Sequence, residues 1–287
     1  MSDKSYLNNE TEIAWCPGCG NFKIRQSVDE ALQSLDVERK DVVFVSGIGQ
    51  AAKAPHYLNV NFFNGLHGRA LPAAIGIKAA NPGLTVIVES GDGDMYGEGG
   101  NHLLHAIRRN SNITVLVHNN MVYGLTKGQA SPTSRRGFHT PVQVEGVTER
   151  PFNPVSTAIA NNAGFVARAN GGDADETAEI IKKALQYRGF SLVDLFQTCV
   201  SFNKLNNVKW FRDHTYYLDE DYEPGNRTEA FAKSIEEDPM PLGVLYTAPE
   251  RETFSDTLPV YRENKEPLFK RSFDQSVITA IIDKKMM

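Results

Sequence analysis

The sequence lacks the features that mark membrane, nucleic-acid-binding and secreted proteins. No apolar run approaches the ~18 residues of a membrane span. The 30 lysines and arginines do not outnumber the 35 aspartates and glutamates, so a net charge of -5 leaves no basic footprint for nucleic acid. The N-terminal segment MSDKSYLNNETEIAW is polar and acidic, unlike a signal peptide. We therefore expect a cytoplasmic protein that binds neither membranes nor nucleic acid.

Cysteine is also scarce, and the sequence shows no internal repeat or low-complexity segment. Three cysteines in 287 residues are too few for a disulfide framework, which agrees with reduced thiols in the cytoplasm. Hydrophobic residues nevertheless make up 41% of the chain, enough for one large core. The length allows one or two domains.

The hydrophobic pattern predicts a doubly wound α/β fold with a parallel sheet. Three continuous, largely β-branched runs are typical of strands buried on both faces: Val42–Ser46, Leu84–Glu89 and Ile113–His118. Ser191–Phe196 is predicted as a further strand. Helix-length segments lie between or before these strands at Gly97–Arg109 and Asp173–Arg188. We assign this α/β domain to residues 1–205.

The chain beyond residue 205 has a different character. It is rich in turn residues and has no sustained period, yet it contains aromatic side chains, which argue against plain disorder. These are Trp210, Phe211, Tyr216, Tyr217, Phe231 and Tyr261. Two interpretations remain open for residues 206–287: an irregular C-terminal arm that packs on the core or on a partner subunit, or a small subdomain with its own core.

Polar and glycine residues follow two successive predicted strands. Gly91-Asp92-Gly93-Asp94 comes after the strand that ends at Glu89, and Asn119-Asn120 ends the next one. Ligands of parallel sheets bind at the carboxyl ends of strands, where glycines let backbone N–H groups approach a phosphate. Asp92 and Asn120, 28 residues apart, would meet at one sheet edge and supply oxygen ligands to Mg²⁺. Either motif alone is also typical of an ordinary turn.

A second glycine motif competes for a cofactor. Gly47–Ala52, GIGQAA, fits the G-x-G-x-x-A pattern of dinucleotide-binding folds. Such a site needs an acidic residue about 20 positions later for the ribose, and residues 42–88 contain no aspartate or glutamate. The pattern therefore disfavours NAD and suits a diphosphate or carboxylate.

The cysteines by themselves leave three kinds of site open. Cys16 and Cys19 form a CxxC motif, and Cys199 follows the last predicted strand. A thioredoxin-like dithiol, a zinc site and an iron–sulfur cluster all use such cysteines.

Six motifs, taken in order, resemble a known family. They are CPGCGNF, SGIG-x-x-x-K-x-P-H-Y, LHGRALP-x-A-x-GIK, GDGD, NN-x-x-YG-x-TKGQ-x-SPT and CVSFN. Over residues 14–205 the chain resembles the β subunit of 2-oxoacid:ferredoxin oxidoreductases, most closely the 2-oxoglutarate type. This resemblance implies the thiamine diphosphate-binding fold, in its pyrophosphate-type domain. It also implies thiamine-dependent oxidative decarboxylation of a 2-oxoacid to acyl-CoA and CO₂, reversible as reductive carboxylation, with electrons passing to ferredoxin.

The resemblance also implies the cofactors and their ligands. They are thiamine diphosphate, Mg²⁺ and a [4Fe–4S] cluster, with coenzyme A as cosubstrate. The side chains of Asp92 and Asn120 and the carbonyl of Val122 would bind Mg²⁺. The cluster ligands would be Cys16, Cys19 and Cys199, and Gln50 stands where the family has a fourth cysteine.

The remaining site residues follow from the same resemblance. Residues implied to contact the cofactor are Gly49, His67, Gly91, Gly93, Asp94 and Thr126. Lys53, Leu125 and Lys127 are implied to line the substrate pocket. An ammonium group at Lys53 suits a second substrate carboxylate, which favours 2-oxoglutarate over pyruvate or a branched-chain 2-oxoacid.

No glutamate here has a convincing context for activating the thiamine aminopyrimidine. In the family that residue lies on a larger α subunit, or on a fused γ–α subunit, and two β subunits pair in a heterotetramer. Two other functions stay open: a non-oxidative thiamine-dependent decarboxylase or synthase subunit, and a non-catalytic electron-transfer or zinc-binding subunit.

Overall fold

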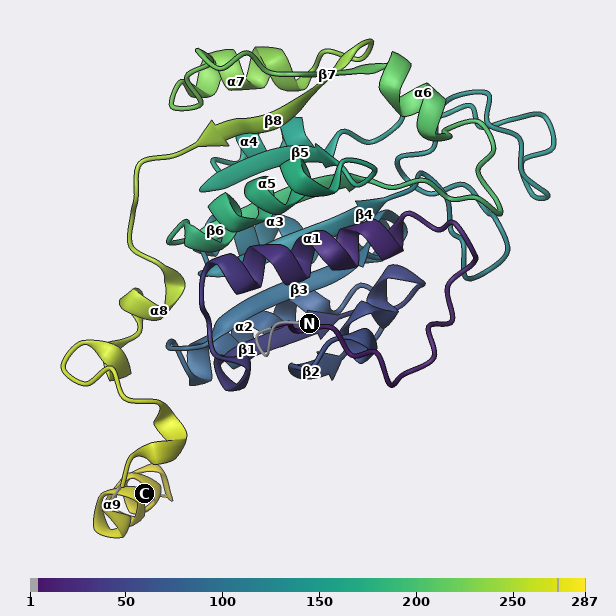
Figure 1. The fold of residues 1–287 in the computed structure, drawn as a ribbon. Helices are drawn as coiled ribbons and strands as arrows, with labels where there is room; N and C mark the ends of the chain where they lie inside the picture. Colours follow the sequence, from purple (N-terminus) through teal and green to yellow (C-terminus); the bar gives the residue numbers. More distant parts are fainter. Residues whose placement is uncertain (1–4, 273, 287) are drawn as a thin grey trace.

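A mostly parallel sheet forms the centre of the molecule (Figure 1). The computed structural model describes residues 5–272 and 274–286. Within them eight strands lie in the order β2-β1-β3-β4-β6-β5-β8-β7, and only the β5–β8 pair is antiparallel. The strands are β1 (Val42–Ser46), β2 (Asn61–Asn64), β3 (Thr85–Gly91), β4 (Ile113–Asn119), β5 (Phe165–Asn170), β6 (Phe190–Phe196), β7 (Thr215–Tyr217) and β8 (Met240–Thr247). The predicted doubly wound sheet is confirmed.

Helices cover both faces of this sheet, which explains the continuous apolar strands. On one face pack α1 (Asn21–Ser34) and α5 (Ala174–Gln186). On the other pack α2 (Ala70–Ala80), α3 (Gly100–Arg109) and α4 (Pro154–Ala160). None of the helices in the described part of the chain combines the length and apolar character that a membrane span requires.

The helix predicted over residues 97–109 is divided in the structure. A π-helical segment, η3 (Gly93–Glu98), precedes α3, and the Gly99 N–H donates to the Asp94 carbonyl five residues earlier. A Cβ at Gly97 would lie 2.6 Å from the Tyr123 hydroxyl, so this wide turn packs tightly against Tyr123. Inserted π turns are frequent at functional sites.

The first part of the segment after residue 205, expected to be an irregular arm or a small subdomain, consists of regular elements. First come α6 (Val208–Asp213), β7, α7 (Arg227–Ser234) and β8, and β7 and β8 extend the sheet. Phe211 stacks on Phe196 at 5.1 Å, which explains part of the aromatic content. Pro241 and Gly243 interrupt the strand signal of β8 in the sequence.

The irregular part of the chain follows β8 and runs away from the body (Figure 1). Tyr261 anchors this segment to the body. Its ring is buried, and its hydroxyl donates to the carbonyls of Ala79 and Ala80 at the end of α2. The short helices along the chain are η1 (Arg39–Asp41), η2 (Ala51–Tyr57), α8 (Phe254–Thr257), η4 (Pro259–Tyr261) and η5 (Leu268–Lys270), followed by α9 (Gln275–Met286).

The strand register brings the predicted functional residues to one edge. Gly91 at the end of β3 pairs with His118 on β4, and Asn119 pairs with Phe196 on β6. The segments that follow these three strands therefore begin side by side.

We predict that Leu192→Ala lowers the free energy of unfolding by about 2–5 kcal/mol, because Leu192 on β6 is 0% exposed and its removal leaves a cavity. Leu104→Ala on α3 is the matched control: Leu104 is 38% exposed, and we expect a change within about 0.5 kcal/mol. Urea denaturation measures both, and equal losses would contradict this assignment of the core.

Candidate active site

Two neighbouring hollows lie at this sheet edge. The first, here the glycine pocket, is lined by residues 48–51, 67, 91–94, 120 and 122–126. The second, here the cysteine pocket, is lined by residues 15, 16, 19, 21, 50, 120, 124, 197 and 199–202. Gln50, Asn120 and Gly124 belong to both linings, so the two pockets share a wall.

The structure gathers most of the residues predicted for the site. Those that line the glycine pocket are Gly49, His67, Gly91, Asp92, Gly93, Asp94, Asn120, Val122, Leu125 and Thr126. Two of the residues predicted to contact the cofactor or the substrate do not line it. Lys53 is half-buried in η2, and Lys127 is exposed in a turn with a positive φ of 84°. Their predicted contacts with substrate therefore stay predictions.

The buried Asp94 carboxylate holds the glycine pocket together. It accepts hydrogen bonds from the backbone N–H groups of Ile48 (3.0 Å) and Gly68 (2.8 Å), and from the Ser90 hydroxyl (2.7 Å). His67 Nδ1 lies 2.6 Å from the same carboxylate. Asp94 thus joins the segments after β1 and β2 to the end of β3.

Asp92 is almost fully buried, at 1% exposure. Its Oδ2 accepts hydrogen bonds from the hydroxyls of Ser131 and Thr133, both at 2.6 Å. Burial raises the pKa of Asp92 to about 6, although these two hydroxyls oppose the rise. Near neutral pH the site therefore holds a poorly solvated negative charge.

The two asparagines at the end of β4 have different surroundings. Asn119 donates to Asp194 Oδ1 (3.0 Å) and accepts from the Thr133 hydroxyl (2.9 Å). Asn120 donates to Gln197 Oε1 (2.8 Å) and accepts from the Val122 N–H (3.1 Å). Of the pair, only Asn120 lines the glycine and cysteine pockets.

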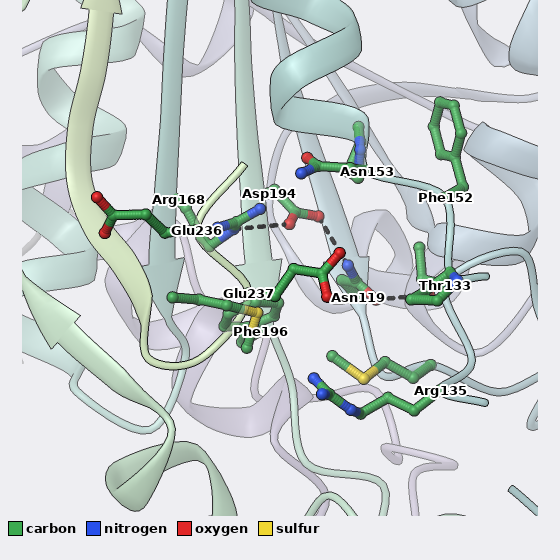
Figure 2. Close-up of a pocket in the computed structure, with 14 residues that line it drawn as sticks. Asn119, Thr133, Arg135, Phe152, Asn153, Arg168, Asp194, Phe196, Glu236 and Glu237 are labelled. Carbon is green, nitrogen blue, oxygen red and sulfur yellow. Dashed lines mark hydrogen bonds and ion pairs between the residues drawn. The ribbon is translucent and has the colours of Figure 1, made fainter. Parts of the chain in front are cut away.

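A buried polar network connects Asp92 to Asp194 beside a cavity that Figure 2 shows. Arg168 Nε lies 3.3 Å from Asp194 Oδ2, and the Tyr96 hydroxyl donates to Asp194 Oδ1 at 2.9 Å. Burial raises the pKa of Asp194, whereas Arg168 opposes the rise. Asn119 and Thr133 continue this network towards Asp92.

The three thiols come together in the cysteine pocket although Cys199 is far from the CxxC motif in the sequence. Gln197 Nε2 donates to Cys19 Sγ (3.4 Å), and the Ser201 hydroxyl donates to Cys16 Sγ (3.1 Å). Burial raises the pKa of the Cys19 thiol to about 11. Among residues 5–272 and 274–286, no three His, Cys, Asp or Glu side chains converge as the ligands of a single metal ion do.

Comparison with protein families identifies the domain that carries these pockets. Residues 43–195 match the C-terminal TPP-binding domain of thiamine pyrophosphate enzymes. Residues 199–263 match the C-terminal region of the pyruvate ferredoxin oxidoreductase beta subunit.

Individual relatives agree with both matches. The chain is 39% identical to 2-oxoacid:ferredoxin oxidoreductase 1, subunit beta, of Aeropyrum pernix, over 90% of this chain and 86% of that one. It is 45% identical to the 2-oxoglutarate oxidoreductase subunit KorB of Mycobacterium tuberculosis, over 69% and 53%. A solved 2-oxoglutarate:ferredoxin oxidoreductase from Magnetococcus marinus superposes with a TM-score of 0.90 at 34% identity, covering 98% and 97%.

The chain belongs to the 2-oxoacid:ferredoxin oxidoreductase β subunits. The family, the fold and the reaction class predicted from the motifs are confirmed. These relatives are named as beta subunits, so each is one part of a multi-subunit enzyme.

The sequence motifs did not predict three residues that the structure places at the site. Ser131 and Thr133 hold Asp92, and Gln197 contacts both Asn120 and Cys19. The SPT motif after the paired asparagines was a usable signal, because hydroxyls commonly bind buried carboxylates. Gln197 precedes Cys199 by two positions and carried no such signal.

We predict that Asp92→Asn stabilises the protein when divalent ions are removed. At pH 7 to 8 the buried carboxylate is charged, and the neutral amide avoids a cost of roughly 1–3 kcal/mol. Because the folded protein binds the Asp92 proton more tightly than the unfolded chain, this cost grows as pH rises from about 4 to about 6 and is constant at higher pH. Urea denaturation in EDTA from pH 5 to pH 8 should show a difference that shrinks at low pH, and a pH-independent difference would contradict the assignment.

Proposed function

We propose that this β subunit holds thiamine diphosphate and Mg²⁺ in the glycine pocket and a [4Fe–4S] cluster in the cysteine pocket, within a 2-oxoglutarate:ferredoxin oxidoreductase that uses coenzyme A. The observation that carries the proposal is the shared wall of the two pockets. A cofactor that releases electrons and a cluster that accepts them need such proximity.

The glycine pocket offers the donors that Mg²⁺ prefers. Asp92, Asn120 and the carbonyl of Val122 supply oxygen atoms only, which suits a hard cation that also binds a diphosphate. A side chain at Gly93 would collide with the Tyr123 ring, so only glycine allows this close backbone approach. Gly49, which also lines the pocket, has a φ of 128° and open space where a Cβ would lie.

We propose that His67 contacts the diphosphate. The Asp94 carboxylate accepts a hydrogen bond from Nδ1–H, which fixes the ring, and Nε2 can donate to a diphosphate when it also carries a hydrogen. Glu98 lies 3.6 Å from that Nε2. Thiamine diphosphate supplies the electron sink for decarboxylation when bound, and the chain binds and orients it.

The cysteine pocket suits a cluster that has one ligand other than cysteine. Cys16, Cys19 and Cys199 supply three thiols, and in a cubane cluster each thiolate binds a different iron. Gln50 lines the same pocket, and its Oε1 is buried without a hydrogen-bond partner. This unpaired Gln50 oxygen supports a cluster whose fourth iron binds Gln50 or water instead of a cysteine.

Lys53 and two relatives support 2-oxoglutarate as the substrate. The M. tuberculosis relative is named a 2-oxoglutarate oxidoreductase, and the M. marinus structure contains 2-oxoglutarate, coenzyme A and succinyl-CoA. A cation at Lys53 would pair with the distal carboxylate of this substrate. Pyruvate and branched-chain 2-oxoacids lack that carboxylate.

The glycine pocket is half of an active site. It encloses about 90 Å³, well below the roughly 300–1,000 Å³ of typical small-molecule sites. Ile48 and Leu125 line it and are each 41% exposed. We propose that the larger subunit covers this apolar rim and supplies the activating glutamate. Two β subunits would complete a heterotetramer that passes electrons to ferredoxin in the cytoplasm.

Cofactor analysis of the anaerobically purified complex tests the proposal. We expect thiamine diphosphate, iron and sulfide in the wild type, with an iron–sulfur signal in electron paramagnetic resonance. Asp92→Ala should lose thiamine diphosphate and keep iron, because it removes a Mg²⁺ ligand, whereas Cys199→Ala should lose iron and keep thiamine diphosphate. Zinc in place of iron and sulfide would overturn the cluster assignment.

Substrate kinetics test the role of Lys53. Lys53→Ile should raise KM for 2-oxoglutarate roughly 10–150-fold, the loss of one charged hydrogen bond, and change KM for pyruvate little. Lys182→Ile, which removes a half-buried lysine of α5 that pairs with Glu179, is the control and should change neither value. A similar rise for both substrates in the Lys53 variant would exclude Lys53 from the specificity pocket.

A further inference from the structure

The Gln197 side chain connects the two pockets. Gln197 directly follows β6, is 2% exposed and donates its backbone N–H to the carbonyl of Asn119 (3.0 Å). This backbone bond continues the β4–β6 pairing and fixes the side chain between the strands' ends.

Every hydrogen-bonding group of this amide has a partner. Its Oε1 accepts from Asn120 Nδ2 at 2.8 Å. Its Nε2 donates to Cys19 Sγ at 3.4 Å and to the carbonyl of Thr198 at 2.6 Å. Because an amide nitrogen has two donor hydrogens, both are used, and the orientation of the Gln197 amide is determined.

This orientation determines which atom Asn120 offers to the glycine pocket. Gln197 binds the amide nitrogen of Asn120, so Asn120 Oδ1 lies at the other side, where the Val122 N–H also donates to it. A flipped Asn120 would place oxygen against oxygen at Gln197 and N–H against N–H at Val122. Gln197 therefore presents an oxygen, the atom that a cation needs.

At its other end Gln197 contacts a cysteine sulfur. Hydrogen bonds to cluster sulfurs favour the more negative, reduced state and raise the reduction potential. Gly20 makes this approach possible, because a Cβ there would lie 2.9 Å from Gln197 Cγ and 3.0 Å from the Thr198 nitrogen. The glycine after the CxxC motif thus lets this loop pack against residues 197–198.

We propose that Gln197 is a positioning residue for both cofactors: it orients the Asn120 amide towards Mg²⁺ and supplies a hydrogen bond to the Cys19 sulfur. The proposal rests on the proposed contents of the two pockets. It assigns one side chain to two centres that no sequence motif connects.

Two variants of the purified complex separate the two roles. Gln197→Leu removes both contacts, so the Mg²⁺-dependent affinity for thiamine diphosphate should fall roughly 10–100-fold and the cluster potential should become more negative. Gln197→Glu keeps an acceptor for Asn120 but replaces the donor to sulfur by a negative charge. We expect near wild-type affinity and a potential at least as negative as in the Leu variant.

Calorimetry measures the affinity, and a redox titration followed by electron paramagnetic resonance measures the potential. Gln33→Leu on α1, whose amide binds Asp29, is the control and should change neither. If the purified wild-type complex contains no iron or no thiamine diphosphate, the proposed function is refuted, and the role of Gln197 falls with it. If the wild type holds both cofactors, an unchanged potential in the Leu variant, or equal affinity losses in the Leu and Glu variants, overturns the role of Gln197.

Discussion

The active-site edge depends on the hydrogen bonds of one buried carboxylate. Asp94 receives N–H groups from the segments after β1 and β2 and a hydroxyl from the end of β3. Its own carbonyl accepts the bond that widens η3 into a π turn. A side chain at Gly47 would collide with this carboxylate, so the first glycine of GIGQAA serves packing here. One residue therefore determines the shape of the pocket and the direction of His67.

Burial of negative charge is the energetic cost of this site. Asp92 and Asp194 are both almost fully buried. Because burial removes water from the charged carboxylates, it raises the pKa of each. Arg168 compensates the charge of Asp194, whereas among the described residues Asp92 has only the hydroxyls of Ser131 and Thr133 as side-chain hydrogen-bond partners. A bound cation would provide the missing positive charge. Sites that are destabilising when empty are a common consequence of selection for binding.

The short path between the two pockets follows from sheet topology. β6 inserts beside β4, with Asn119 opposite Phe196, so that Asn120 and Gln197 follow side by side although 77 residues separate them. α1 begins two residues after Cys19 and packs on the face of the sheet that α5 also covers. This packing brings Cys19 to Gln197. Both contacts use the carboxyl end of a parallel sheet, where loops from distant parts of the chain meet.

The sequence by itself predicted β1, β3, β4 and β6, because their continuous apolar runs are local, and its six motifs indicated the family. The spacing from Asp92 to Asn120 lies within one βαβ unit, so it also indicated the sheet edge where the glycine pocket lies. The sequence did not reveal β2, β5, β7 or β8, and the pairing of β8 with β5 is long-range and antiparallel. The different surroundings of Asn119 and Asn120, and the bridge through Gln197, were decided only by tertiary structure. Those contacts join strands and loops that are distant in the sequence. The order in which strands pair produces no periodic pattern in the local sequence from which it could be predicted.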